Sequence, residues 1–306
     1  MEILKNKTAF VTGGASGIGL GIAKAFADEG MNIVIADLRQ KAIDEVLPYF
    51  EEKGVPALGI KLNVTDRDEY IKAVAAAEAR FGNIHVLVNN AGIGGAHGPL
   101  WAVSTVDTDF ALDINLKGVL NGIQTIVPRM LAHGEGGHVV STASKAALIP
   151  VPGCGLYNLT KQAVVALTET MAEDLIGTTV NASVLCPGPF SSNLGASSRE
   201  IEAELLGREV KKTDMDTPPK DAPPIDFSKV FDKPEDAGRR VVRGIRRNDL
   251  YILTHSSFKK GFEERASAIS RAFPDEPVNE ELAKAFGMLL HNDIFEKQTQ
   301  VPALDK

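Results

Sequence analysis

The chain has 306 residues, of which 44% are hydrophobic and 24% are charged, and its formal net charge at pH 7 is −7. This composition excludes a disordered or collagen-like chain, and the negative charge leaves no basic surface with which to bind nucleic acid. Two cysteines, Cys154 and Cys186, indicate a reducing compartment, and without a signal segment or an apolar run of about 18 residues we expect a cytoplasmic protein with no membrane span.

Short apolar runs alternate with longer segments of helical spacing as far as residue 255. Apolar strands suit a parallel sheet buried on both faces, with helices as the crossovers. The predicted strands are Thr8–Thr12, Asn32–Asp37, Ala57–Val64, Ile84–Asn90, His138–Ser141, Thr179–Cys186 and one in the helix–strand pair Pro234–His255. The predicted helices before that pair are Gly17–Gly30, Gln40–Lys53, Asp66–Phe81, Val106–Ala132 and Gly155–Gly177. We therefore predict a doubly wound (Rossmann) α/β fold with a seven-stranded parallel sheet and its ligand at the carboxyl ends of the strands.

The segment Gly188–Lys233 interrupts this alternation. It contains Thr217-Pro218-Pro219 and Ala222-Pro223-Pro224, with charged residues on either side. A connection of this length inside a compact domain is usually a lid, a binding loop or a disordered insert. Because it follows a strand end, where ligands bind, we expect residues 188–233 to form a lid over the substrate.

Beyond Ser256 the sequence predicts helices over Lys259–Phe273 and Asn279–Leu290, followed by a polar end. At about 150 residues per domain the length suggests two domains, but neither the insert nor the tail looks able to bury a core of its own. We therefore predict one Rossmann domain over residues 1–256 and a helical C-terminal extension over residues 257–306.

The first predicted strand ends in Thr12-Gly13-Gly14-Ala15-Ser16-Gly17-Ile18-Gly19. Glycines let the backbone turn sharply and let a pyrophosphate approach, and the following helix offers free N–H groups and the positive end of its dipole. The spacing departs from the commoner Gly-x-Gly-x-x-Gly, so an ordinary glycine-rich turn is the alternative. Asp37 ends the second strand, where a carboxylate accepts hydrogen bonds from ribose hydroxyls and repels a 2′-phosphate. This favours NAD over NADP, although Arg39 nearby can accommodate a 2′-phosphate.

A second group of polar residues follows the fourth and fifth predicted strands. Tyr157 and Lys161 are spaced i and i+4, on one face of a predicted helix. Ser144 follows the fifth strand, Asn89-Asn90-Ala91-Gly92 ends the fourth, and Asn115 lies in the long helix between them. The tyrosine–lysine spacing alone also occurs by chance, as a surface tyrosine beside a solvated lysine. The joint pattern at the carboxyl ends of parallel strands is much more specific.

Together with the glycine loop, these residues resemble the short-chain dehydrogenase/reductase family, from Lys7 to about His255. The resemblance implies an oxidoreductase that interconverts a secondary alcohol and a ketone. Tyr157 would be the general acid/base and Ser144 would hold the substrate oxygen. Lys161 would bind the nicotinamide ribose and lower the tyrosine pKa, and Asn115 would complete a proton relay through water. A lowered pKa suits the chemistry, because free tyrosine titrates near 10 and base catalysis at neutral pH favours about 7.

The same resemblance implies a set of cofactor contacts. Ser192 stands where a threonine is usual, and Asn63-Val64 replaces the usual Asp-Val near the adenine, which loses a charge but keeps an amide acceptor. Pro187-Gly188 matches the turn beside the nicotinamide. The expected cofactor-binding residues are Gly13, Ser16, Gly17, Ile18, Gly19, Asp37, Asn63, Val64, Asn90, Ala91, Gly92, Tyr157, Lys161, Pro187, Gly188 and Ser192.

The substrate pocket is expected to be mostly apolar. Its candidate residues are His97, Trp101, Cys154 and Phe190, although Trp101 and Phe190 also suit core or lid packing. A closer likeness, carried by Ile35–Gln40, the insert and the tail, is to bacterial Cα-dehydrogenases that oxidise benzylic alcohols of lignin-derived aryl ethers. The alternatives are a 3-oxoacyl or hydroxysteroid enzyme of the same family and a non-catalytic NAD sensor.

No metal site is expected, because the six histidines show no metal-ligand spacing with cysteine or carboxylate. Ser16 and Ser144 do not lie in a Gly-x-Ser-x-Gly nucleophile elbow, which disfavours a hydrolase. The expected partners are a small-molecule substrate and, from the family resemblance, further copies of the chain in a homodimer or homotetramer packed through the long helices.

Overall fold

The computed structural model describes residues 1, 4–192, 194–207, 226, 230–277 and 279–302. One sheet of seven parallel strands has the order β3-β2-β1-β4-β5-β6-β7, which confirms the predicted fold. The order reverses between β1 and β4, so a crevice opens at the carboxyl ends of these two strands. The strands are β1 Thr8–Thr12, β2 Asn32–Asp37, β3 Ala57–Lys61, β4 Val86–Asn89, β5 Gly137–Thr142, β6 Val180–Cys186 and β7 Tyr251–Leu253.

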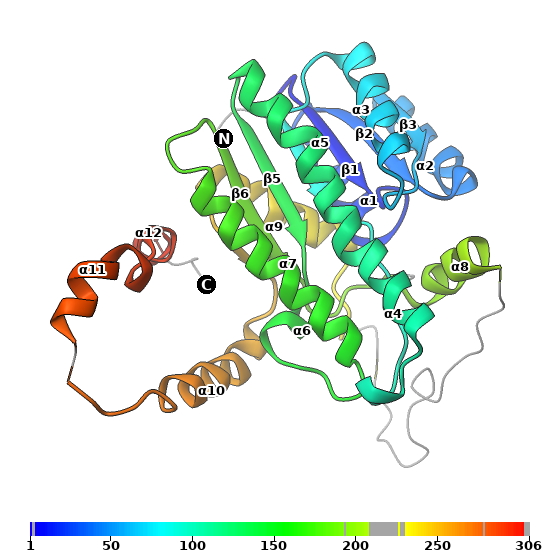
Figure 1. The fold of residues 1–306 in the computed structure, drawn as a ribbon. Coiled ribbons are helices and arrows are strands. Elements are labelled where there is room, and N and C mark those ends of the chain that lie inside the picture. Colours follow the sequence, from blue (N-terminus) through cyan, green and yellow to red (C-terminus); the bar gives the residue numbers. More distant parts are fainter. Residues whose placement is uncertain (2–3, 193, 208–225, 227–229, 278, 303–306) are drawn as a thin grey trace.

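Helices cover both faces of the sheet (Figure 1). They are α1 Gly17–Asp28, α2 Gln40–Glu52, α3 Arg67–Phe81, α4 Thr105–Leu112, α5 Gly118–His133, α6 Lys145–Leu148, α7 Gly155–Asp174, α8 Leu194–Leu206, α9 Pro234–Arg247, α10 Lys259–Ser270, α11 Glu280–Leu290 and α12 Asp293–Gln300, with 3-10 helices at Leu100–Ala102 and Ser256–Phe258. Successive strand residues point to opposite faces. In β1, Phe10 packs into the core under α3, α5 and α7, whereas Ala9 and Val11 pack into the core under α1, α2 and α9.

Helices α1 and α9 approach each other closely through glycines. A Cβ on Gly21 would lie 2.1 Å from the carbonyl oxygen of Pro234, and one on Gly238 would lie 2.3 Å from the carbonyl oxygen of Gly21. The start of α9, which follows the insert, is therefore held against the helix that begins at the glycine loop.

Several elements differ from the prediction. The single helix predicted over Val106–Ala132 is divided by a π-helical turn at Asp113–Lys117, and apolar spacing does not distinguish such a turn from continuous helix. β3 and β4 are shorter than predicted, and the insert contains α8. The end of the tail was predicted only as polar, and it contains the short, mostly polar α12. The proline motifs at 217–219 and 222–224 lie outside the described residues.

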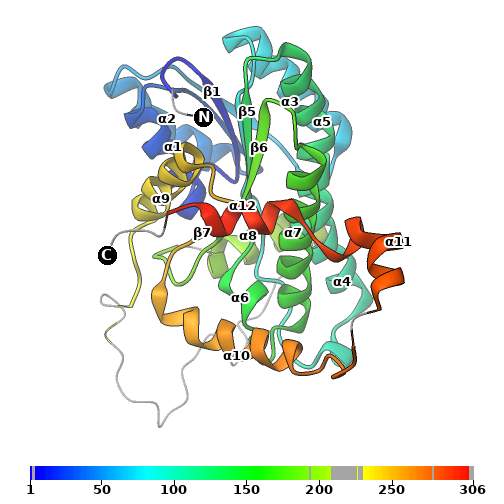
Figure 2. The same cartoon turned by 90° about the vertical axis from the view of Figure 1, so that its left-hand side faces the viewer.

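The tail leaves the domain through α10 and α11, and α12 then crosses back over β7 at the edge of the sheet (Figure 2). The backbone N–H of Leu250 donates to Gln298 Oε1 at 2.5 Å, and Ile294 of α12 is buried. This helix thus covers an edge strand that would otherwise expose backbone groups. No helix in the described parts of the chain is long and apolar enough to span a bilayer.

Candidate active site

The glycine loop joins β1 to α1. Gly13 has φ +60° and Gly17 has φ +51°, conformations that favour glycine. A Cβ on Gly19 would lie 2.2 Å from the Gly13 carbonyl oxygen, so the loop folds back onto the first turn of the helix. Ser16, the N-cap residue, makes no side-chain hydrogen bond to this turn. Free N–H groups and the positive end of the helix dipole are therefore available to an anionic pyrophosphate.

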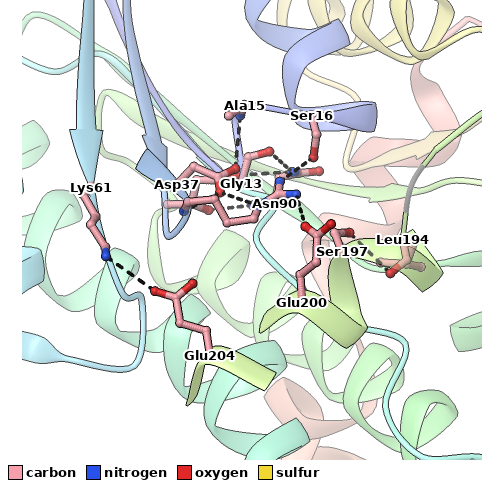
Figure 3. Close-up of polar contacts among 12 residues, drawn as sticks. Gly13, Ala15, Ser16, Asp37, Lys61, Asn90, Leu194, Ser197, Glu200 and Glu204 are labelled. Carbon is pink, nitrogen blue, oxygen red and sulfur yellow. Dashed lines mark hydrogen bonds and ion pairs between the residues drawn. The ribbon is translucent and has the colours of Figure 1, made fainter. Parts of the chain in front are cut away.

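Asp37 ends β2, is 5% exposed and is held beside this loop (Figure 3). One carboxylate oxygen accepts a hydrogen bond from the backbone N–H of Ala15 at 3.2 Å. The other accepts from the backbone N–H of Arg39 at 3.1 Å and from its Nε at 3.2 Å. These bonds fix the carboxylate where the sequence predicts recognition of the adenosine ribose.

Asn90 holds the loop from the neighbouring strand. Its Nδ2 donates to the carbonyl oxygens of Thr12 at 3.1 Å and Gly13 at 3.3 Å. The hydroxyl of Thr12 in turn accepts from the backbone N–H groups of Asn90 at 2.9 Å and Ala91 at 3.1 Å. The ends of β1 and β4 are thus locked together under the crevice.

A cavity runs along these strand ends. Of the predicted cofactor residues, its lining includes Gly13, Ser16, Gly17, Ile18, Asp37, Asn63, Val64, Asn90, Ala91, Gly92, Tyr157, Lys161, Pro187 and Ser192. Gly19 and Gly188 do not line the cavity. Gly19 instead packs against the glycine loop itself. Asn63 faces the cavity, but its Oδ1 already accepts from the backbone N–H and the hydroxyl of Thr65, so the adenine acceptor expected there is engaged within the protein. The sequence analysis missed a further group of lining residues, namely Leu38, Leu62, Ser197, Ile201 and Leu205.

Tyr157 and Lys161 also line this cavity, and Ser144 lies beside Tyr157. Tyr157 and Lys161 lie one turn apart on α7, and the ammonium is 5.7 Å from the centroid of the phenol ring. Lys161 is buried and its Nζ donates to the carbonyl oxygen of Thr142 at 3.0 Å. The side chain of Ser144 makes a hydrogen bond with Tyr157. The cluster can therefore hold a substrate oxygen and exchange a proton with it.

Burial controls the ionisation of this cluster. It raises the pKa of Tyr157, and the hydrogen bond with Ser144 opposes this rise without cancelling it. Burial also lowers the pKa of Lys161 to about 8. The shift of the tyrosine is the reverse of the lowering that the resemblance implied, because the phenolate loses more solvation than the neighbouring side chains restore.

Asn115 lies in the π-helical turn and is almost fully buried. Its Oδ1 accepts from the backbone N–H of Ile93 at 2.8 Å, and its Nδ2 donates to the carbonyl oxygen of Ile93 at 3.0 Å and to Thr160 Oγ1 at 3.2 Å. The amide thus ties the segment after β4 to the helix that carries Tyr157. A π-helical turn is a frequent feature of functional sites.

The sequence model of the short chain dehydrogenases matches residues 7–203, which is more than half of the chain. The chain belongs to the short-chain dehydrogenase/reductase family. It is an oxidoreductase of CH–OH groups that uses a nicotinamide cofactor. The site fits such a cofactor, because the loop offers donors for the pyrophosphate and a fixed carboxylate for the ribose.

Relatives of this dehydrogenase cover nearly its whole length. It is 32% identical over 269 residues to "C alpha-dehydrogenase" of Sphingobium sp. strain SYK-6, which covers 88% of this chain and 87% of that protein. A short-chain dehydrogenase structure from Novosphingobium aromaticivorans is 31% identical, with a TM-score of 0.79 over 97% of this chain and 100% of the other. A Burkholderia phymatum member of the family, solved with NAD, is 30% identical, with a TM-score of 0.80 over 91% and 100% of the two chains.

Of the candidate substrate residues of the dehydrogenase, His97 and Cys154 are in contact with each other. Cys154 Sγ lies 3.5 Å from His97 Nδ1, and burial raises the pKa of the Cys154 thiol. Both cysteines are free and buried. Phe190 is buried, and its ring lies edge-on to the His255 ring with the two centroids 5.3 Å apart. Trp101 is 90% exposed and therefore does not form a wall of an enclosed pocket.

A hydrogen-bonded group that the sequence analysis did not identify holds the turn after β6. The backbone N–H of Gly188 donates to Thr254 Oγ1 at 2.9 Å, and that oxygen is 2.6 Å from His255 Nδ1. The imidazole Nε2 lies 3.4 Å from the carboxylate of Asp232, which pairs through its backbone with the segment around Phe190. Both ends of the insert are thus anchored beside Pro187-Gly188.

The histidine spacing requires one correction. His291, Asp293 and Glu296 place their ligand atoms within 4.8 Å of one another, so the expectation that no histidine has metal-ligand spacing with carboxylates is wrong. All three side chains are exposed, and His291 Nε2 lies 3.5 Å from the Asp293 carboxylate and 3.1 Å from that of Glu296.

Proposed function

We propose that the enzyme oxidises a bulky, aryl-bearing secondary alcohol to a ketone with NAD. The observation that carries this proposal is one cavity lined both by a buried carboxylate, Asp37, and by Tyr157 and Lys161, with Ser144 beside Tyr157. The relative named "C alpha-dehydrogenase" supports an aryl-bearing alcohol as the substrate. When bound, the nicotinamide supplies the hydride acceptor.

The side chains divide the remaining work. Ser144 orients the substrate hydroxyl, and Tyr157 removes its proton. Since burial opposes ionisation of this phenol, a positive charge must favour the phenolate, and both the Lys161 ammonium and an oxidised nicotinamide ring carry one. Lys161 keeps donors for the ribose beyond its bond to Thr142. Asn115 holds the segment after β4 against α7 and supports a proton path through water.

A panel of alcohols tests the substrate class. We expect the highest kcat/KM for benzylic alcohols with a second aryl group, with NAD preferred over NADP. Cyclohexanol, a hydroxysteroid and a 3-hydroxyacyl thioester serve as comparisons. A higher kcat/KM for the steroid or the thioester would change the proposed substrate class but would leave the proposed mechanism intact. Activity confined to small aliphatic alcohols would overturn the aryl assignment.

We also propose a homodimer or homotetramer in the reducing cytoplasm, with residues 188–233 as the substrate lid of a domain spanning 1–256. Leu131 of α5 and Leu159 of α7 are 43% and 45% exposed, which supports contacts between copies through these helices. Light scattering on wild type and a Leu131→Glu, Leu159→Glu variant tests this. A monomeric wild type would contradict it.

A further inference from the structure

Helix α8 of the insert lies against the adenosine end of the cofactor cavity, next to β2 and β3 (Figure 3). Its Ser197, Ile201 and Leu205 line the cavity, as does Leu38 after β2. Ser198 Oγ accepts from the backbone N–H of Gly94 at 3.0 Å. The insert, which the sequence predicts as a substrate lid with nicotinamide contacts at Gly188 and Ser192, therefore also contributes to the other end of the site.

The exposed side of α8 carries two carboxylates that meet the cations of this region. Glu200 Oε2 accepts from Arg39 Nη1 at 3.3 Å. Glu204 Oε1, one turn further along, accepts from Lys61 Nζ at 3.5 Å. Figure 3 shows the two carboxylates reaching from α8 toward β2 and β3.

Each of the three guanidinium nitrogens of Arg39 donates one hydrogen bond within the protein. Nε donates to Asp37, Nη1 to Glu200, and Nη2 to Ser16 Oγ at 2.9 Å. The side chain is only 18% exposed, so these bonds hold it in one position. An arginine recognises a phosphate with two parallel N–H groups. Here Glu200 and Ser16 each engage one N–H of a terminal nitrogen, so a phosphate would have to compete with them for the guanidinium.

We propose that Glu200 is a specificity-determining residue that excludes a 2′-phosphate from the adenosine site. It does so by engaging Arg39, the cation that would otherwise bind the phosphate. The inference rests on the proposed use of NAD.

The exposure of the Glu200 side chain determines how large its effect on phosphate binding should be. The Glu200 side chain is 64% exposed, so solvent screens its charge and its effect is smaller than that of the buried Asp37. We expect Glu200→Gln to raise the affinity for 2′,5′-ADP relative to 5′-AMP by about three- to five-fold, the range of an exposed ion pair.

Isothermal titration of the full-length protein with 2′,5′-ADP and 5′-AMP measures this ratio without turnover. Glu204→Gln is the matched control, because it removes the same charge one helical turn away from a different cation. We expect it to leave the ratio unchanged. In an Arg39→Gln background, Glu200→Gln should give no gain, since the released guanidinium is the phosphate ligand.

Three results would overturn the inference: an unchanged ratio in Glu200→Gln, equal shifts in Glu200→Gln and Glu204→Gln, or a gain that persists without Arg39. Each of them leaves NAD binding by wild type, and hence the proposed function, intact. A wild type that binds 2′,5′-ADP more tightly than 5′-AMP would instead overturn the NAD preference itself.

Discussion

Lys161 is an active-site residue whose ionisation depends on folding. Burial lowers its pKa from 10.5 to about 8. Between these pH values the unfolded chain binds a proton that the folded chain has released. The Lys161 contribution to the free energy of unfolding therefore rises with pH. Below about pH 8 the lysine is charged in both states, and its burial lowers the stability by the full amount. Other buried groups also titrate in this range, so we expect the contribution of Lys161 as a difference: the unfolding free energy of wild type relative to that of Lys161→Met should rise between these pH values.

Urea unfolding at about pH 7 and about pH 10 measures this difference. Lys72→Met, which removes an exposed lysine of α3, is the control and should follow wild type. Equal pH dependence in wild type and Lys161→Met would contradict the burial argument.

Gly188 is the second residue that the site depends on. A Cβ here would lie 2.6 Å from His255 Nδ1 and 2.7 Å from a ring carbon of Phe258. In Gly188→Ala the imidazole must move, which displaces the turn that we propose lies beside the nicotinamide. We therefore expect the KM for NAD to rise by about ten-fold through overpacking of about 1–3 kcal/mol. The Gly188→Ala, His255→Ala double variant should recover part of the loss. A normal KM in Gly188→Ala would show that the contact is unimportant.

Local spacing explains which site residues the sequence could predict. The glycine loop, Asp37 and the pair Tyr157 and Lys161 are set by single strand–turn–helix units, so their positions follow from the order of residues. Thr254 and His255 were missed because they meet Gly188 only across 66 residues of chain. The ionisation of Tyr157 was also missed, since burial depends on the assembled core.

The contact between helices α1 and α9 connects the glycine loop to the end of the insert. Gly21→Ala would place a methyl group 2.1 Å from a backbone carbonyl, and backbone cannot yield as a flexible side chain does. We expect a loss of about 1–3 kcal/mol or more in unfolding free energy, measured by urea denaturation. Gly287→Ala, where nothing lies within 4 Å of the added carbon, is the control. Equal stability of the two variants would contradict the close packing.

The strands were predicted well because apolar runs in a doubly wound sheet are a strong local signal. The π-helical turn at Asp113–Lys117 and helix α8 were not predicted. A π turn adds one residue without changing which residues are apolar, and the place of α8 on the cavity depends on contacts with Gly94, Arg39 and Lys61 that are distant in sequence.

For the whole molecule, α12 determines whether the edge of the sheet is covered. Ile294 is buried where α12 docks, whereas Ile269 of α10 is 50% exposed. Ile294→Asp would bury a charge without a partner, so we expect α12 to detach, at a cost of about 2 kcal/mol, and β7 to become open to pairing between chains. Light scattering should then show added self-association in Ile294→Asp but not in Ile269→Asp. Identical behaviour of the two variants would contradict this role of α12.

In the proposed mechanism, Tyr157 exchanges the proton while the rest of the site binds NAD. Turnover of a benzylic alcohol by Tyr157→Phe, measured beside NAD binding by titration calorimetry, tests it most directly. We predict that turnover falls about a thousand-fold, as for loss of a general acid/base, while the dissociation constant for NAD stays within about three-fold of wild type because the phenol hydroxyl is a minor part of the contact. Near-normal turnover in Tyr157→Phe would contradict the mechanism.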